Sequence, residues 1–249
     1  MTNADANTWE PQARPVAFYH VAAIGHWKEI LTEQLSLLKK SGFDGMIYIG
    51  FIGQQYEDGF ISRVANAIGL SCEIRTFGSD MRQYEFPTLR WCHQFCQEAP
   101  DGPVLYFHCK AVSNTSWPWV MWRWLMNALN LADWRRATDA LQRHNCAGAS
   151  WHANAFPVSY FPGNFWWARV SFVRQLTALD DYIKQFEDCI RHRNPHGFSR
   201  RHAAECWINS RKNAQPFIAG PPASRFWDHK WWTSREAEEW CAVAYKQGH

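Results

Sequence analysis

Charge-capable side chains follow a strand pattern near the middle of the chain. Residues 103–107 form an apolar run of strand length, and His108 and Lys110 come at its end. Open α/β sheets place their chemistry at the carboxyl ends of strands, so both side chains are candidate catalytic groups. Lys110 would supply a compact fixed positive charge that suits a phosphate group. The alternative is a lysine that only covers the end of the strand.

A glycine turn that runs into two tryptophans is the second motif, at Gly163, Asn164, Phe165, Trp166 and Trp167. Glycine permits a close approach of the backbone to a ligand. Asparagine offers both a donor and an acceptor to sugar hydroxyl groups. We predict that Gly163 and Asn164 contact a bound sugar and that Trp166 and Trp167 provide a stacking surface for sugar rings. The alternative is that the indoles lie in the core, which strand alternation favours for one of them.

Glu205 is the candidate general base. It lies in an otherwise apolar stretch that follows a basic run, and a carboxylate in such surroundings can accept a proton from a hydroxyl group. The alternative is a structural ion pair between Glu205 and Arg200 or Arg201.

Three further polar residues are candidates for contacts with a nucleotide. Arg123 lies on a tryptophan-rich helix, where its planar guanidinium could stack on an indole and bind a phosphate. Asp80 and Arg82 lie in a loop after a strand, a common place for nucleotide contacts in α/β folds. For Arg123 the alternative is a side chain that covers the edge of the core.

Alternating strand and helix patterns must position these residues. The expected strands are 16–20, 46–53, 71–76 and 104–108, and the expected helices between them are 27–40, 58–68 and 85–97. This alternation predicts a three-layer α/β sandwich with a mostly parallel central sheet and right-handed crossovers. Further along the chain we expect helices at 116–130, 133–144, 169–176, 180–191, 200–210 and 234–245, and short strands at 147–151 and 158–161.

One domain accounts for most of the 249 residues, because no linker or charge block divides them. We expect a flexible N-terminus at 1–15, a catalytic domain at 16–215 and a tryptophan-rich C-terminal extension at 216–249 that packs on it. The formal net charge of +3 gives no electrostatic case for binding nucleic acid.

The cysteines are expected to be reduced. The chain has 8 of them, but its start lacks the basic and then apolar run of a signal peptide, so we expect a cytoplasmic protein. Cys92, His93 and Cys96 lie close together, yet no second pair completes a zinc-binding spacing, and buried thiols are favoured over structural zinc.

The sequence resembles a family of bacterial and large-virus glycosyltransferases with a GT-A-like, Rossmann-like fold. The matching segments span roughly residues 16 to 210, and they are Phe18–His20, Trp27–Ile30, Ser41-Gly42, Tyr84–Leu89, His108–Lys110, Trp122-Arg123 and Gly163–Trp167. Two positions depart from the family pattern: Cys109 stands where threonine is usual, and Ala111 where glycine is usual.

The resemblance implies transfer of a hexose or deoxyhexose from a nucleotide-sugar donor to a hydroxyl group of an oligosaccharide or lipid-linked glycan, in synthesis of surface polysaccharide or lipopolysaccharide. A carboxylate at the place of Glu205 is the usual general base of inverting members. Asp80, Arg82, Lys110, Arg123, Gly163 and Asn164 would then bind the donor, and Trp166 and Trp167 the sugars.

Many enzymes with a GT-A fold have a metal-binding Asp-x-Asp motif at the end of the fourth strand. At that position this chain has His108, Cys109 and Lys110. We therefore expect no cofactor, with Lys110, helped by His108, in place of a metal ion; Mg²⁺ or Mn²⁺ is the alternative.

The tryptophan-rich stretch 227–232 could contact the inner membrane from the cytoplasmic side, or it could close over the core. Two other functions are left open, a non-catalytic carbohydrate-binding protein and a nucleotide-sugar hydrolase.

Overall fold

A seven-stranded sheet forms the centre of the computed structural model, which describes residues 9–113, 116–226, 228 and 230–247. In sheet order the strands are β3 (Cys72–Thr76), β2 (Ile47–Ile52), β1 (Val16–Ala22), β4 (Pro103–His108), β6 (Trp166–Arg169), β5 (Cys146–Gly148) and β7 (Pro216–Ile218). Only β6 runs antiparallel to its neighbours, β4 and β5. The predicted α/β fold with a mostly parallel central sheet is confirmed.

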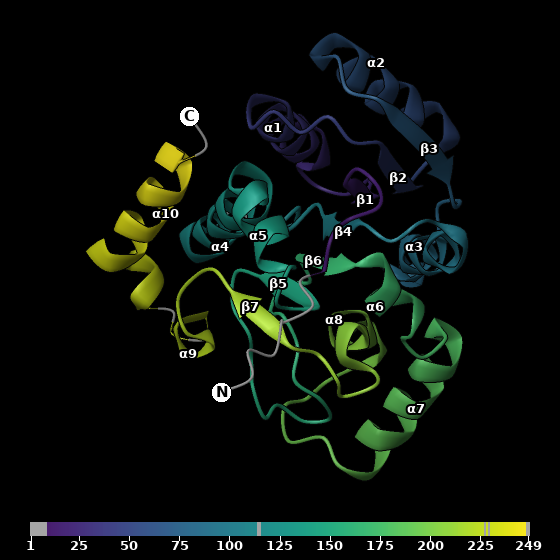
Figure 1. The fold of residues 1–249 in the computed structure, drawn as a ribbon, viewed down its shortest axis with the longest axis vertical. Helices are drawn as coiled ribbons and strands as arrows, with labels where there is room; N and C mark the ends of the chain where they lie inside the picture. Colours follow the sequence, from purple (N-terminus) through teal and green to yellow (C-terminus); the bar gives the residue numbers. More distant parts are fainter. Residues whose placement is uncertain (1–8, 114–115, 227, 229, 248–249) are drawn as a thin grey trace, which may run out of the picture.

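Helices surround this sheet (Figure 1). The α-helices are α1 (Trp27–Lys40), α2 (Asp58–Ile68), α3 (Phe86–Glu98), α4 (Trp117–Asn127), α5 (Trp134–Ala140), α6 (Val170–Arg174), α7 (Leu179–His192), α8 (Ala203–Cys206), α9 (Ala223–Phe226) and α10 (Arg235–Gln247). Short 3₁₀ turns are η1 (Gln55–Glu57), η2 (Met81–Gln83), η4 (Arg200–His202), η5 (Trp207–Asn209) and η6 (Trp231–Thr233), and η3 (Ala128–Ala132) is a π-helical turn.

Alternate residues of the central strands enter two separate cores, one on each face of the sheet. Tyr19 and Phe107 stack in the core beneath α1 and α4, with ring centroids 4.2 Å apart. Tyr106 and Trp166 stack in the core beneath α3 and α7, with centroids 5.3 Å apart. Because both faces of the sheet are buried, the sequences of these strands are nearly continuous apolar runs.

The strand β6 corrects the expectation that Trp166 and Trp167 form a sugar-stacking surface. Both side chains are 0% exposed, and they enter opposite cores. The Trp166 Nε1–H donates to Asn164 Oδ1 at 3.0 Å, and the Trp167 Nε1–H donates to the Asn130 carbonyl at 2.9 Å. The stacking prediction is wrong because the pair is in the middle of the sheet, where β4 and β5 flank it on either side.

Other expected elements differ in detail. The expected strand 158–161 is reduced to a single bridge between His152 and Tyr160. The expected helix 200–210 is divided into η4, α8 and η5. This interruption matters because Glu205 lies in its central part, on the short helix α8.

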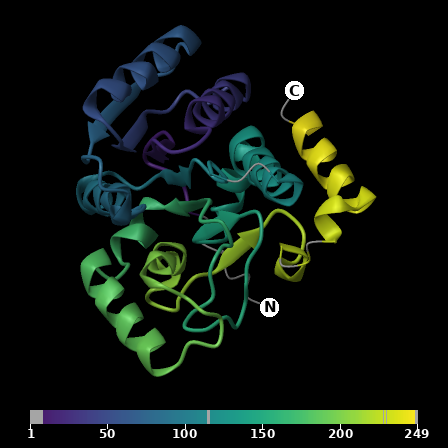
Figure 2. The same ribbon diagram turned by 180° about the vertical axis from the view of Figure 1, so that it is seen from behind.

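Both ends of the described part of the chain contact the rest of the domain. At the N-terminal end residues 1–8 lie outside the described residues, while the Trp9 Nε1–H donates to Asp101 at 2.6 Å. In the expected extension 216–249, β7 joins the sheet beside β5, and α10 lies against α4, as two opposite views show (Figures 1 and 2). Over the described residues, every helix is too short or too polar to cross a bilayer.

Replacing Trp166 with phenylalanine should lower the free energy of unfolding by about 2 kcal/mol. The substitution removes the indole N–H that Asn164 accepts and leaves a small cavity. Urea unfolding followed by far-UV circular dichroism measures the change. Trp117→Phe is the matched control, since Trp117 is 43% exposed, and its effect should stay below about 0.5 kcal/mol. Equal effects of the two substitutions would contradict the core position of Trp166.

Candidate functional site

A cleft of about 700 Å³ lies at the carboxyl ends of β1 and β4. Three of the predicted site residues line it together: His108, Lys110 and Glu205. The other polar and aromatic lining residues are His20, Tyr84, Glu85, Ser113, Trp119, Trp122, Tyr160, His196, Phe198, Arg201 and His202. The sheet thus joins segments that are far apart in the sequence at one concave site, as expected for an open α/β fold.

Lys110 is the second residue after the end of β4 and contributes a cation without an ion pair among the described residues. Its Nζ lies 4.2 Å from the ring centroid of Trp122, on α4. Within the described residues it forms no ion pair with a carboxylate. A half-buried ammonium without a protein counterion, on the surface of a cleft, is suited to an anionic ligand.

His108 is uncharged near neutral pH. Burial, reinforced by the charge of Lys110, lowers its pKa to about 4. The neutral ring donates its Nε2–H to the Gly163 carbonyl at 2.9 Å. The 3.9 Å approach of the same nitrogen to Glu85 is therefore not an ion pair. His108 adds no positive charge to the cleft, contrary to the expectation that it would assist Lys110 against a phosphate.

The Gly163 turn connects the two halves of the site. Its carbonyl accepts the His108 bond, and its N–H donates to Glu205 Oε2 at 3.3 Å. The backbone of Gly163 has a φ of +88°, and a Cβ there would lie 3.2 Å from Trp122 Nε1. Glycine is therefore needed for conformation and for space. Gly163 is buried and does not line the cleft, so its expected contact with a donor sugar is not supported.

Asn164 is likewise inaccessible to a ligand. It is 0% exposed, its Nδ2 donates to Glu85 Oε2 at 2.6 Å, and its Oδ1 accepts the Trp166 indole N–H. The predicted contact with a sugar is wrong because both ends of the Asn164 amide form hydrogen bonds with buried protein groups.

Glu85 was missed by reasoning from the sequence. It directly precedes α3, and its Oε2 accepts hydrogen bonds from both Asn164 and the Tyr106 hydroxyl, the latter at 3.0 Å. Its side chain is 18% exposed and lines the cleft. The signal in the sequence was a carboxylate at the start of a helix that follows a strand and a loop, close to Asp80.

Glu205 has no charged partner among the described residues. Arg200 pairs with Glu187 instead, at 3.7 Å, and Arg201 forms no ion pair in the same part of the structure. The structural alternative for Glu205, an ion pair with either arginine, is not realised. Its carboxylate accepts one backbone N–H and faces the cleft with its remaining capacity to accept hydrogen bonds.

Asp80 and Arg82 lie outside the cleft lining. They bind each other on η2 at 2.9 Å, and hydrogen bonds from Arg82 lower the pKa of Asp80. The Arg82 side chain is 87% exposed. Their neighbours Met81 and Tyr84 line the cleft instead, because the 3₁₀ turn directs the two charged side chains to solvent. The predicted donor contacts are not supported.

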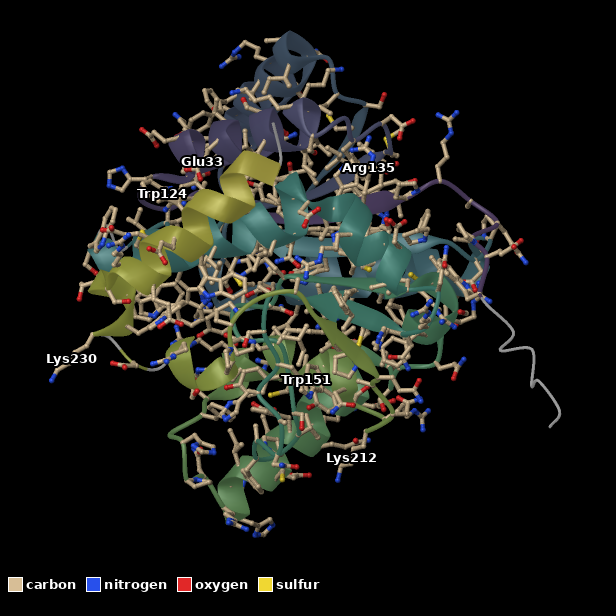
Figure 3. The ribbon with its side chains drawn as sticks, turned by 60° about the vertical axis from the view of Figure 1, so that its left-hand side comes forward. Glu33, Trp124, Arg135, Trp151, Lys212 and Lys230 are labelled. Carbon is tan, nitrogen blue, oxygen red and sulfur yellow. The ribbon has the colours of Figure 1, made fainter. Side chains whose placement is uncertain are left out.

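Arg123 lies at the interface between α4 and α1. It is 9% exposed and its Nη2 donates to Glu33 Oε2 at 3.3 Å. Figure 3 shows Glu33 and Trp124 on the side of the molecule where α10 lies. Arg123 does not line the cleft, so the alternative role at the edge of the core is the correct one.

His20 is a second buried histidine beside the cleft. It is the register partner of His108 on the neighbouring strand β1, and its Nδ1 lies 2.8 Å from Thr88 Oγ1. Burial lowers its pKa to about 4. The lining of the cleft therefore includes two neutral imidazoles, those of His20 and His108.

Strained backbone surrounds the cleft. Tyr84, Ala111 and Asn164 have φ values of 49°, 62° and 54°, in the left-handed region that disfavours residues with a Cβ. Such strain concentrates at functional sites, where the surrounding structure holds it in place. In the glycosyltransferase family that the sequence resembles, glycine is usual at the position of Ala111. A positive φ there would explain the glycine, which adopts this conformation without strain.

Within the described part of the chain, no three or more His, Cys, Asp or Glu side chains gather in a way that could hold a metal ion. Cys92 and Cys96 are buried and form no disulfide. Whether the reaction needs a metal stays a prediction.

Comparisons with known proteins identify the family. One similar solved structure is 4-diphosphocytidyl-2C-methyl-D-erythritol synthase from Anaerococcus prevotii, which is 7% identical, with 94% of this chain and 99% of that chain covered. Its TM-score of 0.45 is too low to bear on function. No curated protein matches the sequence. A family model matches residues 18–247, and the chain belongs to that family, a domain of unknown function (DUF8361).

Proposed function

We propose that this protein is a glycosyltransferase that moves a hexose or deoxyhexose from a nucleotide-sugar donor to a glycan hydroxyl group, with inversion. One observation carries the proposal: Lys110 and Glu205, both without a charged partner among the described residues, line the same cleft. A volume of about 700 Å³ accommodates a ligand of this size, since small-molecule sites commonly measure about 300–1,000 Å³.

Lys110 is the group that we assign to the diphosphate of the donor. Negative charge accumulates on the leaving phosphate as the bond to the sugar breaks, and a fixed cation stabilises that charge. Next to Lys110, Trp119 and Trp122 are stacked with ring centroids 5.3 Å apart, and both line the cleft. Trp119, which is partly exposed, is the aromatic surface that we assign in place of Trp166 and Trp167, and Trp122, 5% exposed, packs behind it.

Glu205 is the group that we assign as general base. The acceptor hydroxyl gives its proton to the Glu205 carboxylate, its oxygen bonds to the anomeric carbon, and the carbon–phosphate oxygen bond breaks as the nucleoside diphosphate leaves. A single displacement of this kind inverts the anomeric centre. Glu85 is less suited because its Oε2 already accepts two short hydrogen bonds, from Tyr106 and Asn164.

The cellular setting of the proposal rests on the resemblance alone: synthesis of surface polysaccharide or lipopolysaccharide, in the cytoplasm, with a peripheral membrane contact. The membrane contact gains no support from Trp231 and Trp232, which are 3% and 1% exposed. The ring centroids of Trp232 and Trp122 are 6.2 Å apart, so Trp232 packs behind the aromatic side of the cleft. Trp227 and His229 lie outside the described residues.

A non-catalytic carbohydrate-binding protein is the second candidate, favoured by the aromatic lining of the cleft. Such a protein would not need Lys110 or Glu205. Release of nucleoside diphosphate in the presence of donor and acceptor separates the two functions. A nucleotide-sugar hydrolase would release free sugar without an acceptor.

Lys110→Gln should weaken binding of nucleoside diphosphates about tenfold to a hundredfold, because a charge-assisted hydrogen bond is worth about 1.5–3 kcal/mol. Thermal shift with a panel of nucleotides and nucleotide sugars finds the ligand, and calorimetry gives the affinity. Lys40→Gln, an exposed lysine at the end of α1, is the control. Transfer should also survive excess chelator; activity lost to chelator and restored by Mn²⁺ would contradict charge neutralisation by Lys110.

Glu205→Gln should abolish transfer and leave donor binding intact, because the amide cannot accept the hydroxyl proton. Product formation with labelled donor measures the loss, which we expect to exceed a factor of about 100. Glu98→Gln, on the exposed end of α3, provides the control. Substantial residual transfer by Glu205→Gln would assign the base elsewhere, with Glu85 the next candidate.

The stability of the protein should fall as the pH drops from about 6.5 to about 4. His20 and His108 stay neutral in the folded state down to about pH 4, whereas the unfolded chain protonates them below about pH 6.5. Each histidine therefore lowers the free energy of unfolding by up to about 3 kcal/mol over this range. Urea unfolding at pH 7 and pH 4.5 measures the difference. His108→Gln, which keeps a donor for Gly163, should reduce it; an unchanged difference would contradict the neutral, buried state of His108.

A further inference from the structure

Arg201 is a second unpaired cation in the cleft. It lies on η4, its side chain is exposed, and it lines the cleft without an ion pair to any described residue. The adjacent Arg200 differs in both respects, since it pairs with Glu187 and does not line the cleft. Only the guanidinium of Arg201 is therefore free to bind a ligand there.

Arg201 belongs to the same structural segment as the proposed base. η4 continues directly into α8, and Glu205 follows Arg201 by four residues, about one helical turn. η4 is a 3₁₀ turn and α8 is an α-helix of four residues, so Arg201 and Glu205 lie on successive short helical elements. Both line the cleft, so a molecule whose hydroxyl group contacts Glu205 also comes within reach of Arg201.

The side chains next to Arg201 in the sequence add imidazole and aromatic groups to the cleft lining. The Nδ1 of His202 lies 2.9 Å from the Ser199 backbone nitrogen and 3.1 Å from the Ser199 carbonyl oxygen, so the backbone holds the ring in place. Phe198 stacks on His202 with ring centroids 4.8 Å apart, and it lines the cleft together with His196. This part of the cleft offers a guanidinium, imidazole groups and an aromatic face.

On the basis of the proposed function, we propose that Arg201 with His196 and His202 forms a subsite for an anionic acceptor: a sugar that bears a carboxylate or a phosphate close to the hydroxyl group that attacks. The planar fork of arginine binds either group through two parallel hydrogen bonds. An acidic acceptor gains this charge-assisted interaction and a neutral acceptor does not, which makes the site selective for acidic glycans.

The assignment to the acceptor follows from the positions of the two cations. Lys110 comes from the end of β4 and lies against Trp122, whereas Arg201 precedes the helix that carries the base. The base must touch the acceptor hydroxyl group. The cation one turn away on the same segment therefore binds the same molecule, and Lys110 is left for the diphosphate.

The test compares wild-type protein, Arg201→Gln and Arg200→Gln on an array of neutral, uronic acid-containing and phosphorylated glycans, in the presence of the nucleoside diphosphate that stabilises the protein most. Each substitution removes one positive charge, and the two residues are adjacent, so Arg200→Gln is the matched control for Arg201→Gln. We expect wild type and Arg200→Gln to prefer acidic glycans, and Arg201→Gln to lose about tenfold to a hundredfold of that binding. Comparison of the uronic acid and phosphate arms identifies the anion.

Nucleotide affinity provides the second readout. It should be unchanged in Arg201→Gln and lowered in Lys110→Gln. A preference of the wild type for neutral glycans, an equal loss in the two arginine variants, or a weaker nucleotide affinity in Arg201→Gln would overturn the acceptor subsite. Failure of every nucleotide to bind the wild type would instead contradict the proposed glycosyl transfer, so the two failures are distinguishable.

Discussion

The backbone of Gly163 joins the two halves of the site, and the arrangement of the cleft depends on it. Its carbonyl accepts a hydrogen bond from His108 at the end of β4, and its N–H donates to Glu205 on α8. The turn can make both contacts because glycine tolerates a φ of +88° and leaves room for Trp122. Lys110 and Glu205 thereby share one cleft although almost a hundred residues separate them.

Beneath the cleft a buried polar network supports this turn. Asn164 connects Glu85 to the indole of Trp166, and Tyr106 donates a second hydrogen bond to Glu85. Each of these buried polar groups has a partner, which is the condition for a polar network to specify one structure. His108 is neutral, whereas Lys110, Arg201 and Glu205 bring charged groups to the cleft. Glu205 thus has two roles, since it accepts the Gly163 N–H and also faces the cleft.

The two cations Lys110 and Arg201 lie in different parts of the cleft and would orient the two substrates. Lys110 lies by the aromatic pair Trp119 and Trp122, and Arg201 lies one turn before Glu205. A leaving diphosphate at the first cation and an anionic acceptor at the second would bring the reacting hydroxyl group to the carboxylate. This division follows from which element carries each side chain, since strand ends and the η4–α8 segment enter the cleft from different parts of the chain.

The sequence by itself determined the α/β class, the first four strands and the candidate residues His108, Lys110 and Glu205, because hydrophobic periodicity and strand-end polarity are local properties. It could not determine which polar residues reach the cleft. Asn164, Trp166 and Trp167 resemble a sugar site in the sequence, yet strand pairing with β4 and β5 buries them. Asp80 binds Arg82, only two residues along the chain. Arg123 faces α1 and Glu85 enters the site, because their solvent exposure and hydrogen-bond partners depend on contacts between distant segments. Those contacts exist only in the tertiary structure.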